Sequence, residues 1–71
     1  MIPGAEQVIA NGREVRADLP CSIERFLLDQ RLLPRSVVVE LNGEPVTPSE
    51  FSLRQLKPGD RLEIVKIVAG G

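Results

Sequence analysis

The sequence predicts an α+β domain in which one amphipathic helix packs on a mixed sheet of four or five strands. Three observations carry this prediction: two Asn-Gly pairs flanked by strand-like residues, one apolar pattern of helical spacing between them, and a strand-like run after a Pro-Gly-Asp turn. A chain of 71 residues is long enough for one such core. Residues 1–71 are therefore expected to form a single domain.

The N-terminal part is predicted to be a β-hairpin over residues 6–17. Asn11-Gly12 suits the type I′ turn that joins twisted antiparallel strands. After this hairpin, Ser22 can cap a helix over residues 23–31, whose apolar side chains recur at helical spacing: Ile23, Phe26 and Leu27.

Pro34 ends this helical region, because proline disfavours the helical conformation of the residue before it. Leu32 and Leu33 are expected to anchor in the core just beyond the helix.

The second half of the chain is predicted to add strands and one short helical turn. Residues 37–41 form a strand, Asn42-Gly43 a tight turn, and residues 44–46 a short strand that Pro45 confines to an edge. Residues 47–51 resemble the capped start of a short helix, and residues 57–60 a β-turn. The run over 61–67 is the clearest strand.

This order of elements predicts the ubiquitin-like β-grasp. A hairpin, a crossover helix and a last strand parallel to the first satisfy the right-handed connection rule, and the helix covers one face of the sheet. Alternation along the strands turns one set of side chains toward the helix: Val37, Val39, Leu41, Leu62 and Ile64. It turns a second set to the open face, which we take as candidate partner-binding residues: Val38, Glu40, Glu63 and Val65.

Composition favours a carrier or binding module over an enzyme. With 42% hydrophobic and 27% charged residues the chain is typical of a folded domain, yet its small core leaves little room for a catalytic cleft. A net charge of −1, the lack of a basic run and only two aromatic residues argue against nucleic acid. No apolar stretch approaches a membrane span, so a cytoplasmic protein without membrane contact is expected. Acids are scattered along the chain; they could steer a basic surface of a partner, and simple solvation is the interpretation we favour for them as a group.

Metal chemistry is not expected, because the chain has no histidine and one cysteine, Cys21. A reactive thiol ahead of the helix is one interpretation of Cys21, and a small apolar residue at the edge of the core is the one we favour.

The segment after the last strand, Val68-Ala69-Gly70-Gly71, is predicted to be a flexible tail. Two glycines have no turn to make there, so fold stability gives them no purpose. Without Cβ atoms they can enter a narrow channel on a partner and present the carboxylate of Gly71. That carboxylate becomes reactive only once it is activated, for instance as an adenylate.

Three motifs in the second half of the sequence resemble those of a known family. Asn42-Gly43-Glu44 after a valine-rich strand, Leu56-Lys57-Pro58-Gly59-Asp60 before the last strand, and Glu63-Ile64-Val65 ahead of Gly70-Gly71 are similar to the ThiS family of thiamine-biosynthesis sulfur carriers. The resemblance implies a carrier with no bound cofactor. An adenylating enzyme would use ATP and magnesium to activate Gly71, a desulfurase-derived persulfide would convert it to a thiocarboxylate, and thiazole synthase would accept the sulfur.

Three alternatives remain open from the sequence. The small subunit of molybdopterin synthase shares the fold and the Gly-Gly end, but its relatives usually carry prolines where this chain has Ile67-Val68-Ala69. A TGS-like regulatory module would sit in a longer, basic chain. A protein-conjugating modifier shares the activation step and differs only in its acceptor.

Overall fold

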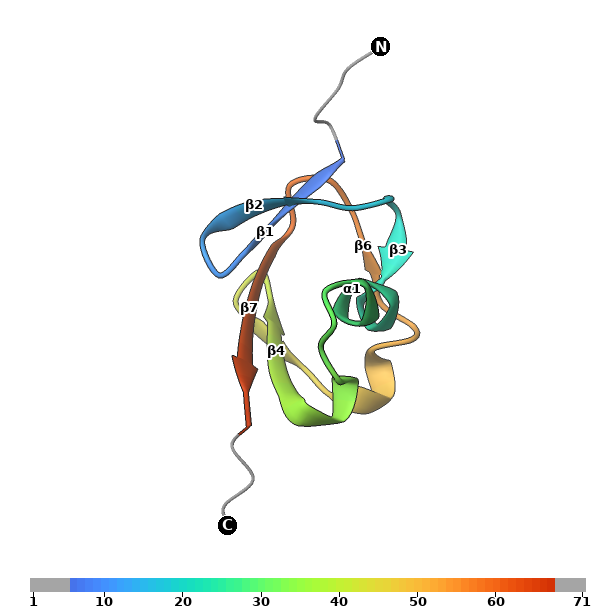
Figure 1. The fold of residues 1–71 in the computed structure, drawn as a ribbon, viewed down its shortest axis with the longest axis vertical. Coiled ribbons are helices and arrows are strands. Elements are labelled where there is room, and N and C mark those ends of the chain that lie inside the picture. Colours follow the sequence, from blue (N-terminus) through green and yellow to red (C-terminus); the bar gives the residue numbers. More distant parts are fainter. Residues whose placement is uncertain (1–5, 68–71) are drawn as a thin grey trace.

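The computed structural model describes residues 6–67. A five-stranded sheet in the order β2-β1-β7-β4-β5 carries α1 on one face (Figure 1). The main elements are β1 (Gln7–Ala10), β2 (Arg13–Arg16), α1 (Ile23–Asp29), β4 (Val37–Leu41), β5 (Glu44–Val46) and β7 (Arg61–Lys66). The α+β, ubiquitin-like β-grasp prediction is confirmed.

The N-terminal hairpin forms in the expected register, with Val8 opposite Val15. Asn11 and Gly12 have φ angles of 53° and 81°, as a type I′ turn requires. β1 then pairs in parallel with β7, Ile9 opposite Arg61 and Ala10 opposite Leu62. The parallel pairing of first and last strands is therefore confirmed.

The helix begins where the sequence predicts and ends earlier. The Ser22 hydroxyl accepts a 3.0 Å hydrogen bond from the Arg25 N–H, which caps the helix. The predicted helix over 23–31 is two residues too long, because α1 ends at Asp29 and Arg31 adopts a left-handed φ of 61°. The Leu32 N–H then bonds the Leu27 carbonyl at 2.8 Å and the Arg31 N–H bonds the Leu28 carbonyl at 2.9 Å. These two bonds form a Schellman motif, which satisfies the last carbonyls of the helix.

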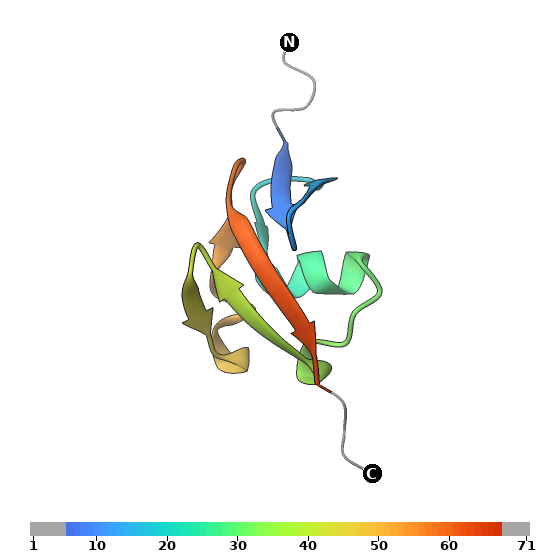
Figure 2. The ribbon, with the colours of Figure 1, turned by 90° about the vertical axis from the view of Figure 1, so that its left-hand side faces the viewer.

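β4 pairs antiparallel with β7 and, on its other side, with β5. Figure 2 looks onto these three strands from the side away from α1. The alternation is as expected, since Val37, Val39 and Leu41 are buried between exposed Val38 and Glu40. β5 is an edge strand, which accommodates Pro45.

A second, two-stranded sheet was not predicted. β3 (Cys21–Ser22) pairs antiparallel with β6 (Gln55–Leu56) beside the start of α1. The described residues also form two 3₁₀ turns. The first, η1 (Pro34–Ser36), was not predicted, and the second, η2 (Pro48–Glu50), lies where the sequence predicts a short helical turn.

The core lies between α1 and the sheet. Its buried hydrophobic residues include all the predicted helix residues, together with four not named from the sequence: Val8, Val46, Phe51 and Leu56. Leu62 is buried, Ile64 is half-buried against this core, and Leu32 packs on it as expected. The expectation for Leu33 is wrong, because its side chain is 68% exposed. Its extended backbone ahead of Pro34 turns it away from the side that Leu32 occupies.

Candidate functional site

The sheet face opposite α1 contains all four candidate partner-binding residues. Val38 and Glu40 lie on β4, and Val65 and Glu63 lie on β7, with all four side chains exposed. The antiparallel register places Val38 directly opposite Val65 and Glu40 directly opposite Glu63. Residues far apart in the chain therefore form two adjacent cross-strand pairs, which we call the open-face pairs.

The apolar open-face pair is the one nearer the C-terminal end of β7. Val38 is 50% exposed and Val65 is 62% exposed, so both keep apolar surface in contact with water. Ile67 follows β7 directly and is 52% exposed, and its N–H bonds the Ser36 carbonyl at 2.8 Å. Ile67 was not among the partner-binding residues predicted from the sequence. Continuing the exposed, apolar positions of β7 by two residues would have found it.

The acidic open-face pair places two like charges opposite each other. Neither Glu40 nor Glu63 forms a salt bridge within the described part of the chain, where the two ion pairs are Arg25–Asp29 and Arg54–Glu50. Like charges directly opposite each other on neighbouring strands destabilise a sheet. The fold therefore gains nothing from this pair.

Two asparagine side chains, which were not predicted from the sequence to have a role at the site, hold β7 in place. The Asn11 side chain accepts from the Ile64 N–H at 2.7 Å and donates to the Ile64 carbonyl at 3.0 Å. The Asn42 side chain accepts from the Arg61 N–H at 3.0 Å and donates to Asp60 at 3.2 Å. Both asparagines belong to the Asn-Gly turns, so the same residues form the turns and tie them to the strand that leads to the tail.

The expected carrier residue and its tail, Val68, Ala69, Gly70 and Gly71, lie outside the described residues. The last described element before them is β7, which pairs with β4 on one side and with β1 on the other. The tail therefore follows the central strand of the five-stranded sheet.

Cys21 is half-buried and packs against the core. Burial raises the pKa of its thiol, and the nearby carboxylates of Asp29 and Asp18 raise this pKa further against a smaller opposing effect of Arg25. A raised pKa keeps the sulfur protonated at neutral pH, and the thiolate is the nucleophile. The structure thus supports the interpretation of Cys21 as a small apolar residue at the core edge.

No helix among the described residues is long and apolar enough to cross a membrane. Residues 6–67 also contain no cluster of three or more histidine, cysteine, aspartate or glutamate side chains that could hold a metal ion.

Comparison with known proteins shows which family this chain belongs to. The chain has 26% sequence identity to the crystal structure of the thiamine biosynthesis protein ThiS from Geobacter metallireducens, with a TM-score of 0.78 over 92% of this chain and 99% of that chain. A solution structure of a thiamine biosynthesis protein from the same organism also has 26% identity, with a TM-score of 0.75 over 92% of this chain and 87% of that chain. No curated protein matches. The sequence model of the ThiS family matches residues 5–71, nearly the whole chain, and the chain therefore belongs to the ThiS family.

Proposed function

We propose that this protein is a sulfur carrier of thiamine biosynthesis and that Gly71 is the residue that carries the sulfur. The observation that carries the proposal is the family match, because it runs through residue 71 and so includes Gly70-Gly71. The similar structures, which are thiamine biosynthesis proteins by name, support the same pathway. In this role the protein is a co-substrate of partner enzymes and has no catalytic residue of its own.

The chemistry begins at the carboxylate of Gly71. An adenylating enzyme of the ubiquitin-activating type, with ATP and magnesium, joins this carboxylate to AMP and releases pyrophosphate. The terminal sulfur of a persulfide, supplied through a cysteine desulfurase, then attacks the acyl carbon and AMP leaves. The product is an acyl disulfide with a new carbon–sulfur bond; a thiol then cleaves its sulfur–sulfur bond, which leaves a thiocarboxylate on Gly71 and a disulfide on the donor, and thiazole synthase takes the sulfur from the thiocarboxylate.

The open-face pairs are the proposed docking surface for these partners. Val38 and Val65 offer apolar surface close in sequence to the start of the tail, and Glu40 and Glu63 offer two negative charges next to them that form no salt bridge within residues 6–67. An apolar contact with a basic rim on the partner would match both pairs. The like-charge pair has no stabilising purpose in the fold, which supports a role for it outside the fold.

The proposal is tested by intact-protein mass spectrometry. The chain ending in a free carboxylate at Gly71 is incubated with its adenylating enzyme, ATP, magnesium, a persulfide donor and a thiol. We expect a product heavier by the exchange of one oxygen for one sulfur atom, located at Gly71 by fragmentation. A variant with one residue added after Gly71 is the control and should gain no sulfur. Absence of the sulfur product with an enzyme that charges another carrier would refute the proposal.

A further inference from the structure

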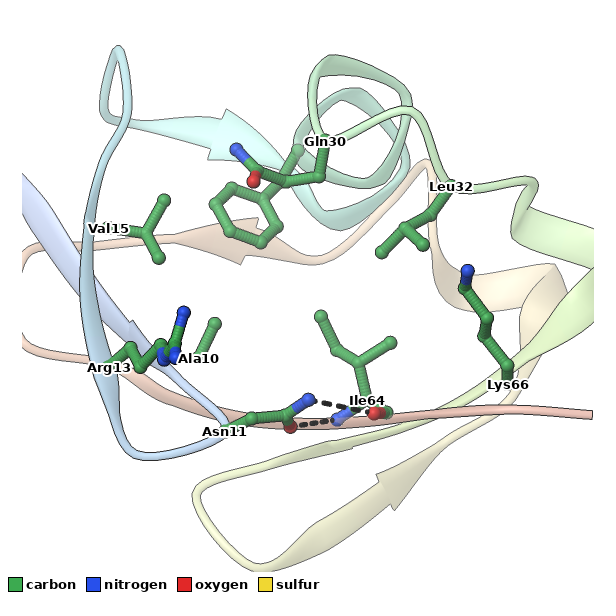
Figure 3. A pocket seen from close by; sticks show the side chains of 9 residues that line it. Ala10, Asn11, Arg13, Val15, Gln30, Leu32, Ile64 and Lys66 are labelled. Atoms are coloured by element: carbon green, nitrogen blue, oxygen red, sulfur yellow. Dashed lines mark hydrogen bonds between the residues drawn. The ribbon is translucent and has the colours of Figure 1, made fainter.

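One cavity of the described residues lies on the opposite side of β7 from the open-face pairs. Its volume is about 540 Å³, between the β1–β2 hairpin, the C-terminal end of α1 and β7 (Figure 3). This volume falls within the range of roughly 300–1,000 Å³ that small-molecule sites occupy. Neither the tail nor the proposed docking surface accounts for it.

The lining of this cavity combines an apolar floor with positive charge. The apolar residues come from the hairpin, the helix, the loop after it and β7: Ala10, Val15, Phe26, Leu32 and Ile64. Figure 3 shows Arg13 and Lys66 on opposite sides of the opening, with Ile64 between them and Val15 on the side of Arg13. No carboxylate is among the lining residues.

The polar side chains that line the cavity differ in whether they already make hydrogen bonds within the protein. Asn11 is bonded to the backbone of Ile64 and is thereby fixed. Within residues 6–67, the side chains of Arg13, Lys66 and Gln30 make neither a hydrogen bond nor a salt bridge. Two cations and one amide can therefore bind a ligand without breaking a contact of the fold.

A neighbouring cavity of about 210 Å³ extends the positive charge. It shares Leu32 and Lys66 with the first cavity and adds Arg31, again with no carboxylate in its lining. Arg31 is held at this position by the left-handed turn that ends α1. The two cavities together place three cations around one apolar surface.

We propose that the cavity binds a small organic anion that has an apolar body, namely an aryl or branched alkyl phosphate or carboxylate. The apolar body would lie on Val15, Leu32 and Ile64, and the anionic group would lie between Arg13 and Lys66, where it gains charge-assisted hydrogen bonds. The Gln30 amide would supply a further donor or acceptor. This site is independent of the proposed sulfur chemistry, because neither Gly71 nor the open-face pairs contribute to it.

The test is a titration followed by ¹H–¹⁵N NMR spectra, with phenyl phosphate as the probe. We expect shifts at the Gln30 and Asn11 side-chain amides and at the Ile64 and Lys66 backbone amides, with a dissociation constant on the order of 1 mM, as is usual for so small a ligand. Phenol and inorganic phosphate, each half of the probe, should bind at least about tenfold more weakly if both parts of the cavity contribute. Benzoate should bind at the same residues and show that a carboxylate can replace the phosphate.

Variants separate this site from unspecific attraction. The double variant R13Q/K66Q should weaken phenyl phosphate binding at least about threefold, whereas Lys57→Gln, which removes an exposed charge outside the cavity, should leave it unchanged. Ala10→Leu should fill the floor and abolish the shifts while the remaining spectrum stays folded. Equal binding of inorganic phosphate or of phenol, equal loss with Lys57→Gln, or the absence of shifts at the cavity would each overturn the proposal.

Discussion

At the scale of single residues, two asparagine side chains determine where β7 lies. Asn11 and Asn42 both have positive φ angles, 53° and 52°, and each bonds the backbone of β7 through its amide. Glycine would tolerate the same backbone angle but could not make these bonds. The first residue of each Asn-Gly turn is therefore under two requirements, one from the turn and one from the strand.

We expect Asn11→Gly to lower the free energy of unfolding by about 1–3 kcal/mol, because the Ile64 N–H and carbonyl lose their partner while the turn is kept. Asn11→Ala should cost a further 1–2 kcal/mol or so, since alanine at this φ is strained. Urea denaturation of both variants measures the two contributions separately. Equal stability of Asn11→Gly and the parent protein would show that the side-chain bonds contribute nothing.

Cys21 should react slowly with alkylating reagents in the folded protein. Its raised pKa leaves less thiolate at pH 8 than a free cysteine has, and half-burial restricts access to the sulfur. Mass spectrometry of iodoacetamide labelling in buffer and in urea compares the two states, and the pH profile in buffer should rise later than that of glutathione. Faster labelling of the folded protein would contradict the interpretation of Cys21 as an inert residue.

At the scale of elements, the end of α1 is held in a conformation that its residue does not favour. Arg31 takes the left-handed position of the Schellman motif, which glycine usually occupies. The bonds of Leu32 and Arg31 to the last turn of the helix hold it there. Some strain is therefore retained at a site where the chain also contributes a cation to the smaller cavity.

Arg31→Gly should raise the free energy of unfolding by about 0.5–1 kcal/mol, because the strain of roughly 1–2 kcal/mol is removed at a smaller entropic cost. Arg25→Gly is the comparison within α1, where the same change should destabilise the protein by at least about 1 kcal/mol, since glycine is unfavourable inside a helix and the ion pair with Asp29 is lost as well. Thermal unfolding followed by circular dichroism compares the two. A loss of stability in Arg31→Gly would mean that the arginine side chain stabilises the fold by contacts of its own.

Local patterns predicted the elements of the fold well where turn chemistry and alternation agree. Asn11-Gly12, the Ser22 cap and the alternation of Val37–Leu41 each depend on neighbours in the sequence, and each was predicted correctly. The pairing of β3 with β6 could not be foreseen, because two-residue strands carry no periodic pattern and pair only through the tertiary fold. The end of α1 was missed because Arg31 is an unusual residue for a left-handed position.

The candidate site, like the fold, was predictable only where it depends on a local sequence pattern. Alternation correctly turned Val38, Glu40, Glu63 and Val65 outward, but only the antiparallel register shows that they face one another in pairs. The cavity between the hairpin and α1 has no signal in the sequence, since its lining comes from three separate segments. Leu33 was misplaced because its direction depends on the backbone angles before Pro34.

At the scale of the whole molecule, the two sides of the sheet differ in charge along β7. β7 carries one member of each open-face pair on one side and lines the apolar, positively charged cavity on the other. Among the described residues, neither Glu40 nor Glu63 forms a salt bridge, and neither Arg13 nor Lys66 has a carboxylate beside it in the cavity lining. A basic partner and a small anion would thus be directed to opposite sides of the same strand.

The open face allows a test of docking that leaves the core untouched. Val65 is 62% exposed on β7, and Leu53 is 74% exposed in the turn after η2, away from the sheet. Aspartate at either position should change the melting temperature little, since neither side chain belongs to the core. The two substitutions remove similar exposed apolar groups and add the same charge, so Leu53→Asp is a matched control for Val65→Asp.

We expect Val65→Asp to weaken binding to the adenylating enzyme by roughly tenfold or more, because burial of one valine at an interface contributes about 1.5–3 kcal/mol. Leu53→Asp should bind as the parent protein does. Isothermal titration calorimetry gives both affinities, and melting temperatures are measured on the same samples. Unchanged affinity of Val65→Asp would show that the partner engages the protein without the open face, and a loss of folding would show that Val65 supports the core in a way its exposure does not reveal.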